Sequence, residues 1–233
     1  MRSDHFKVLY EDNHLIAVFK PGGWLVQGDS TGDKPLSDYV KEYIKVRYKK
    51  SGDVFLGVIH RLDRPVSGLV IFARTSKALS RMNEMFREHT IQKTYYAIVG
   101  ERPKEIEERL THYLIKDKEK NRARASISKR SKDAKKSDLD YRLLASIANH
   151  HLLEVKPLTG RPHQIRVQLA KINCSIRGDL KYGSLHRNRD GFIHLHSYKL
   201  AFIHPVKKVP IELTCYPPKE QLWDKFGSFI KNN

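Results

Sequence analysis

The stretch His60-Arg61-Leu62-Asp63-Arg64-Pro65-Val66-Ser67-Gly68-Leu69 places one carboxylate among cationic neighbours, between two apolar segments. Residues 54–60 and 69–73 have the composition of buried strands, so the polar residues between them are expected to form a loop. The neighbouring histidine and arginines would keep Asp63 ionised. Such a carboxylate acts either as a reactive group or as one half of an ion pair that holds the loop.

The composition favours a polyanionic partner. The chain has 233 residues, and 44 Lys and Arg against 26 Asp and Glu give a formal net charge of +18. Nucleic acid is the first expectation. No apolar run approaches the roughly 18 residues of a spanning helix, and the polar start lacks the apolar core of a signal peptide, so we expect a cytoplasmic protein that binds no membrane. The two cysteines, Cys174 and Cys215, suggest neither a disulfide framework nor a zinc site.

The rest of the chain predicts an α+β fold. Short β-rich segments alternate with helical apolar periodicity, and strands adjacent in sequence are too closely linked for parallel crossovers. We therefore expect a mixed, mostly antiparallel central sheet flanked by helices and loops. The predicted strands are 6–10, 15–19, 93–99, 139–146, 151–155, 192–203 and 209–215, and the predicted helices are 36–48, 76–88, a helix from Pro162, and a terminal helix containing Leu222, Phe226 and Ile230.

Residues 116–136 are rich in lysine and arginine and poor in apolar side chains. This composition gives too little hydrophobic surface for a core element, so we expect an exposed basic excursion. Two interpretations remain open, because a charged segment is either merely solvated or in contact with RNA.

Two further segments concentrate polar residues. On a helix that starts at Pro162, His163 and Arg166 would share one face, and the positive helix start would favour an anion. In residues 93–97, adjacent tyrosines point to opposite faces of a strand, so one must leave the core side, where it could stack on a base. Each segment also has an ordinary interpretation, as a solvated surface helix and a half-buried strand.

Together these segments resemble the RluA-type pseudouridine synthases. Four motifs occur in the family's order, with Val66 where the family usually has Thr. They are His60-Arg61-Leu62-Asp63 with Ser67-Gly68-Leu69, then Lys93, Tyr95 and Ala97, then Thr159-Gly160-Arg161 with His163-Gln164-Ile165-Arg166, and finally Gly178-Asp179 with Lys181-Tyr182-Gly183.

The resemblance implies a single pseudouridine synthase catalytic domain over residues 1–233, without a separate S4-like RNA-binding module at its N-terminus. It implies an isomerase that converts specific uridines of rRNA or tRNA to pseudouridine after flipping the base, with no cofactor. Asp63 would be the catalytic carboxylate, Arg166 its partner, and Tyr95 the side chain that packs on the uracil. Substrate contact is implied for His60, Arg61, Arg161, His163 and Gln164.

Other readings fit less well. A noncatalytic RNA-binding or RNA-chaperone protein could keep this fold, although it would not need Asp63, Tyr95 and Arg166 together. A glycoside hydrolase normally needs a second carboxylic acid, and none accompanies these motifs. His194 and His196 share a strand face but lack a third ligand, so we expect packing or RNA contact and no metal. We expect a monomer.

Overall fold

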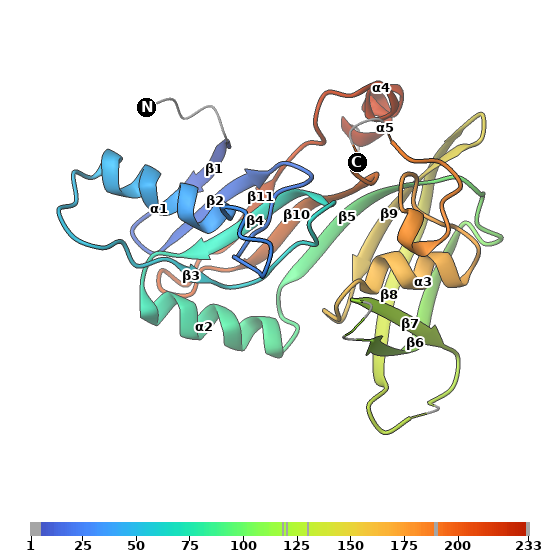
Figure 1. The fold of residues 1–233 in the computed structure, drawn as a ribbon, viewed down its shortest axis with the longest axis horizontal. Coiled ribbons are helices and arrows are strands. Elements are labelled where there is room, and N and C mark those ends of the chain that lie inside the picture. Colours follow the sequence, from blue (N-terminus) through green and yellow to red (C-terminus); the bar gives the residue numbers. More distant parts are fainter. Residues whose placement is uncertain (1–5, 118, 120, 130, 189–190, 232–233) are drawn as a thin grey trace. The chain divides into compact units, whose positions relative to one another are not determined.

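The computed structural model describes residues 6–117, 119, 121–129, 131–188 and 191–231. The chain divides into two compact units, each formed by two separate stretches of sequence. Unit 1 contains Met1–Gln92 and Ser197–Tyr216, and unit 2 contains Lys93–His196 and Pro217–Asn233. Figure 1 shows the helices and strands of both, and each unit is described by itself.

Unit 1 is an antiparallel sheet with two helices. Strands β1, β2, β4, β10 and β11 are neighbours in that order, and β3 also pairs with β4. The elements are β1 (Val8–Glu11), β2 (Leu15–Lys20), α1 (Leu36–Arg47), β3 (Gly57–Val58), β4 (Ser67–Ala73), α2 (Ser76–Arg87), β10 (Leu195–Ile203), which begins in unit 2, and β11 (Pro210–Thr214).

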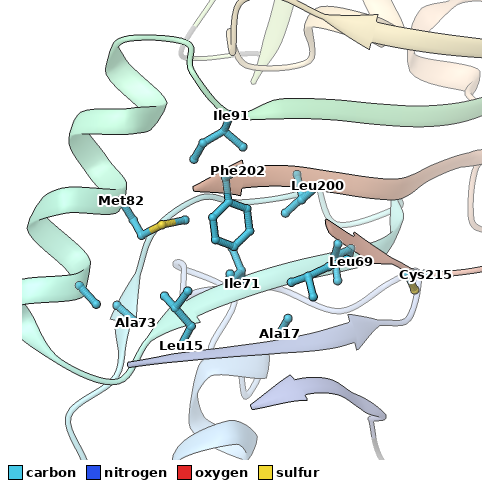
Figure 2. Close-up of a cluster of buried hydrophobic side chains, with 12 residues drawn as sticks. Leu15, Ala17, Leu69, Ile71, Ala73, Met82, Ile91, Leu200, Phe202 and Cys215 are labelled. Atoms are coloured by element: carbon cyan, nitrogen blue, oxygen red, sulfur yellow. The ribbon is translucent and has the colours of Figure 1, made fainter. Parts of the chain in front are cut away.

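The core of unit 1 lies between its sheet and α2 (Figure 2). Leu15 and Ala17 alternate along β2, and Leu69 and Ile71 do so along β4, so each strand sends one face into the cluster. Met82 of α2 is fully buried against them. Truncating a buried side chain of this size lowers the free energy of unfolding by about 2–5 kcal/mol. This packing therefore holds β4 in place, and with it the end of the loop that precedes β4.

The strands of unit 2 are antiparallel and pair in the order β5, β9, β8, β6, β7. Its helix α3 contacts β6 and β7. The elements are β5 (Gln92–Val99), β6 (Glu107–Asp117), β7 (Arg122–Ser126), β8 (Lys135–Ile147), β9 (His150–Pro157), α3 (Gln164–Lys171), the 3₁₀-helix η1 (Leu180–Tyr182), α4 (Gln221–Lys225) and α5 (Gly227–Lys231).

The α+β prediction with mostly antiparallel strands is confirmed. Several boundaries were wrong. The strand expected over 54–60 is limited to the two residues of β3, and α3 begins at Gln164 rather than at Pro162. The single terminal helix that was expected is two short helices, α4 and α5, and Gly227 is the first residue of α5. The break falls at Phe226, directly before Gly227, and glycine is a poor helix former.

The basic excursion was only partly predicted. Many of its cations are exposed, as expected, but β7 and the adjoining ends of β6 and β8 pair within it. Ala123 and Ala134 are buried. The expectation that this segment contains no core element was therefore wrong. Alanine side chains are enough to make a buried strand face where a neighbouring side chain fills the remaining space. Lys118, Lys120 and Arg130 of this segment lie outside the described residues.

Candidate active site

The loop that carries Asp63 ends in a tight turn at the start of β4. The backbone N–H of Val66 donates to the Asp63 carbonyl at 3.0 Å, and the Asp63 side chain is half-buried. Gly68 has a φ of 122°, and a Cβ there would lie 2.4 Å from the Ser197 carbonyl oxygen. Only glycine fits this position, so β4 can approach β10 closely there, and this contact positions the end of the Asp63 loop.

Lys20, which sequence reasoning missed, is fully buried beneath this loop. Its Nζ donates to the carbonyl oxygens of Pro21 at 3.0 Å and Arg64 at 3.1 Å. Burial lowers the pKa of Lys20 to about 7, while the nearby Asp63 carboxylate acts in the opposite direction. In its protonated form, Lys20 thus adds positive potential at Asp63.

The histidine and the two arginines that neighbour Asp63 in sequence have different surroundings. His60 Nε2 accepts a hydrogen bond from the Ile71 N–H at 3.1 Å, and its ring stacks on Phe86 with centroids 5.1 Å apart. Arg64 pairs with Asp33 at 2.6 Å, and Arg61 is exposed. His60 therefore holds the loop to β4, and the substrate contacts predicted for His60 and Arg61 stay predictions.

In unit 2, Gln164 fixes the loop that leads into α3. Its Oε1 accepts from the Thr159 hydroxyl at 2.8 Å and from the Arg161 N–H at 3.0 Å, and its Nε2 donates to the Asp138 carbonyl at 3.0 Å. The Gln164 side chain is buried. These bonds hold the loop against β8, whereas the predicted substrate contacts of Gln164 and Arg161 stay predictions.

Arg166 forms a buried bidentate ion pair with Asp179. Nε and Nη2 donate to the two carboxylate oxygens at 2.7 and 2.9 Å, while Nη1 takes no part in this pair. Arg166 is 5% exposed and Asp179 is 1% exposed. Asp179 belongs to the Gly178-Asp179 motif, but the motif did not predict this ion pair. Two charges with matched geometry make the orientation of the guanidinium highly specific.

Tyr182 joins three parts of unit 2. Its hydroxyl accepts from the buried Ala123 N–H at 2.8 Å and lies 2.7 Å from His163 Nδ1, and the Arg166 guanidinium lies 5.0 Å from its ring centroid. His163 precedes α3 with a left-handed φ of 56°. This sparsely populated conformation persists because neighbouring contacts hold it, and the Tyr182 bond is one of them.

Tyr95 lies on β5, opposite Val155 of β9, and is half-buried, whereas Tyr96 is fully buried. The prediction that the two tyrosines face opposite sides of the strand is confirmed. Lys93, on the same face as Tyr95, donates to the Thr159 carbonyl at 3.4 Å, and burial lowers its pKa to about 8. Lys93 therefore connects β5 to the loop that precedes α3.

Comparison with known families decides the assignment. The family model of RNA pseudouridylate synthases matches residues 14–171, which contain the Asp63 loop, β5 and α3. The chain belongs to the RNA pseudouridylate synthase family. It is therefore a pseudouridine synthase, an isomerase, as the motifs predicted.

Individual relatives agree with the family. A protein of Pectobacterium carotovorum subsp. carotovorum named tRNA pseudouridine synthase C is 32% identical over 225 residues, or 89% of this chain, which spans only 58% of that protein. A protein of the same name from Haemophilus influenzae is 31% identical over 244 residues, covering 95% of this chain and 98% of that protein. A solved structure, Human RNA Pseudouridylate Synthase Domain Containing 4, has a TM-score of 0.77 at 23% identity and covers 97% of this chain and 93% of that one, which supports the fold.

Within the described residues of this pseudouridine synthase, no group of three or more His, Cys, Asp or Glu side chains could hold a metal ion. His194 instead contacts Glu220 at 3.0 Å, and the rings of His194 and His196 pack against Trp223. The expectation that these histidines pack is confirmed. No helix among the described residues is long and apolar enough to cross a membrane.

Proposed function

We propose that this synthase converts uridine to pseudouridine in RNA, with tRNA as the first candidate substrate. Both relatives described above are named for tRNA, while ribosomal RNA is the alternative that the motifs left open. The reaction breaks the bond from N1 to C1′, turns the uracil and joins C5 to C1′; C5 loses its proton to solvent or a base, and N1 takes up one proton, so the product is an isomer of the substrate. It is redox-neutral and needs no cofactor.

Asp63 is the catalytic carboxylate in this proposal, and it adds to the base, attacks C1′ or assists a glycal route. Arg166 steadies that carboxylate, and Tyr95 packs on the uracil and helps to remove the C5 proton. Two observations support this assignment: the pair with Asp179 gives the Arg166 guanidinium a fixed orientation, and the buried Lys20 Nζ donates to the carbonyl oxygen of Arg64, the residue next to Asp63.

The observation that carries the proposal is the buried Lys20 beside Asp63. A fully buried ammonium is costly, and its two carbonyl partners do not neutralise its charge. Its presence is explained if the loop must hold a carboxylate in its charged form. A noncatalytic RNA chaperone would have no use for this arrangement.

Base flipping accounts for the target. The uracil C5 is not accessible to Asp63 within a stacked helix, so the nucleotide must leave the stack at a cost of a few kcal/mol. An unpaired or loop uridine costs least, which favours tRNA arms and rRNA loops. Arg61, which is exposed, is proposed to hold the flipped nucleotide together with His60, Arg161, His163 and Gln164.

We also propose that both units act as one catalytic domain, in a cytoplasmic monomer. The substrate residues come from the two units, so the reaction requires both. The buried free thiols Cys174 and Cys215 are compatible with a reducing compartment.

The test measures tritium release from RNA labelled at uracil C5. The purified protein should release tritium from unmodified host tRNA transcripts, and rRNA fragments form the second arm. Asp63→Asn should lower the rate by more than 1000-fold while RNA affinity changes less than threefold. Asp53→Asn, on an exposed carboxylate of the same unit, is the matched control and should keep the rate. RNA binding without release by the unaltered protein would support the chaperone reading instead.

A further inference from the structure

The strand β7 and its neighbours form a second functional surface in unit 2. Strand β7 pairs with β6 along Arg122–Ser126, and β6 pairs on its other side with the start of β8. Because side chains alternate across a sheet, this three-strand end has one face toward α3 and one face away from it.

The inner face is apolar and fixed. Leu114 and Ala123 are buried with Val167 of α3 and Tyr182 in one hydrophobic cluster. The Tyr182 hydroxyl also accepts the Ala123 N–H at 2.8 Å. The strand is therefore held directly against the helix that carries Arg166, so it is a built part of the unit rather than a solvated loop.

The outer face and the following turn are cationic. Arg124, Lys129 and Lys132 are exposed, and none of them has an acidic partner among the described residues. Arg124 alternates with Ala123, so its side chain points away from α3, whereas the guanidinium of Arg122 lies 5.4 Å from the Tyr182 ring centroid.

The charges at the other end of the same sheet are arranged differently. Arg109 pairs with Asp140 at 2.6 Å, and Glu154 lies 3.6 Å from Arg142 and 2.9 Å from Lys156. Cations there are matched by carboxylates, as on an ordinary solvated surface. At the β7 end Lys136 lies 3.5 Å from Asp138, but Arg124, Lys129 and Lys132 have no such carboxylate among the described residues and would be neutralised by a polyanion.

An aromatic side chain lies within this cationic surface. Tyr113 of β6 is half-buried, and its cross-strand neighbours are Ser126 of β7 and Lys136 of β8. Cross-strand neighbours share a face, so Tyr113 stands on the outer face with Arg124. An aromatic ring between cations is the arrangement that stacks an unpaired base while phosphates are held on either side.

We propose that this surface, formed by Tyr113, Arg124, Lys129 and Lys132, docks a single-stranded segment of the substrate RNA beside the catalytic helix. The inference rests on the proposed function, because it assumes that the partner is RNA. The phosphates contact the three cations and one base stacks on Tyr113. An anionic membrane would use the charge but not a single half-buried tyrosine, so RNA is the better match.

The test measures binding of a 20-nucleotide polyuridylate between 50 and 300 mM salt. The triple variant Arg124→Ser, Lys129→Ser, Lys132→Ser should raise the Kd about 10-fold or more near 0.1 M salt, and it should reduce the salt slope by about 2, since each single-strand phosphate contact contributes about 0.7. The kcat on saturating RNA should stay within twofold while KM rises.

The control is a triple variant of Lys41, Lys45 and Lys50, which are exposed lysines of unit 1 without acidic partners among the described residues. It removes the same net charge and should change the slope by less than half as much. Tyr113→Leu should weaken the binding of polyuridylate roughly 5- to 100-fold. It should leave the binding of heparin, a polyanion without bases, unchanged.

Equal losses in the two triple variants would show that net charge alone is responsible, and an unchanged slope in the first would show that the surface is not used; either result overturns the proposal. These measurements need no turnover. Failure of the unaltered protein to release tritium would contradict the proposed function, whereas normal release with an unaltered KM in the first triple variant would contradict only the docking surface.

Discussion

Replacing Asp179 by Asn should destabilise unit 2 far more than the same change at Asp140. Both carboxylates hold an arginine through Nε and Nη2, Asp179 at 2.7 and 2.9 Å and Asp140 at 2.6 and 2.8 Å. The two pairs differ in burial, since Asp179 is 1% exposed and Asp140 is 37% exposed. The comparison therefore isolates the effect of removing water from an ion pair.

The magnitude follows from what remains after the change. Asparagine keeps one acceptor oxygen for Arg166 but loses the charge and one charge-assisted bond of a buried, bidentate pair. Breaking a buried pair in this way costs about 3–5 kcal/mol. Because asparagine keeps part of the contact, the lower end, about 3 kcal/mol, is expected. The exposed pair of Asp140 is screened by solvent, so its loss should be barely measurable.

Urea unfolding followed by tryptophan fluorescence can read unit 2 alone. Trp223 is buried in unit 2, and Trp24 of unit 1 can be replaced by Phe in every variant. With a slope of about 2 kcal/mol per molar urea, Asp179→Asn should lower the midpoint by about 1.5 M. Added salt should not restore it, since buried pairs are little screened.

Midpoints that fall equally for Asp179→Asn and Asp140→Asn would refute this reasoning, because burial would then have no influence. A midpoint change under 0.3 M for Asp179→Asn would mean that the Arg166 guanidinium does not depend on this carboxylate. The assignment of Asp179 as the residue that orients Arg166 would then be withdrawn.

Two further predictions concern single contacts. Tyr182→Phe should lower the stability of unit 2 by about 1–3 kcal/mol, because the buried Ala123 N–H loses its acceptor and His163 loses its partner, and faster amide exchange at Ala123 would show it. His204 is fully buried, and its Nδ1 accepts hydrogen bonds from two backbone N–H groups. Burial lowers the pKa of His204, so the folded state binds fewer protons than the unfolded state. The free energy of unfolding should therefore fall as the pH drops below about 6.5. His204→Asn keeps an acceptor, and a pH dependence of the urea midpoint between pH 8 and 5.5 identical to that of the unaltered protein would contradict the assignment.

Hydrophobic pattern predicted most of the fold. Strands such as β2 and β4 and helix α2 have apolar residues at the expected spacing, so their packing decides their structure. Strand β7 was missed because Arg122 to Ala125 alternate charge with alanine, which is too small to signal a buried face. Its burial depends on Tyr182, which is distant in sequence and fills the space that alanine leaves.

The sequence predicted the candidate site residues but not the residues that hold them in place. Motif resemblance identified Asp63, Tyr95 and Arg166, whose roles stay predictions. Lys20 was missed, because lysine usually lies at the surface and the sequence gives no signal that this one is buried under a loop. The Arg166 pair with Asp179 crosses 13 residues of sequence, and no local pattern reveals which of several carboxylates an arginine will meet.

The contacts of Tyr182 explain why RNA docking on β7 and the proposed reaction would be coupled. Tyr182 contacts the Ala123 N–H of β7, the His163 ring at the start of α3, and the Arg166 guanidinium. A strand that carries docked RNA would therefore share one rigid neighbour with the catalytic arginine. Catalysis of this kind depends on placing a reactive group within about 0.5 Å of its productive position. A flexible basic tail would raise affinity equally well but could not supply that placement, which accounts for a basic segment that is packed as a strand.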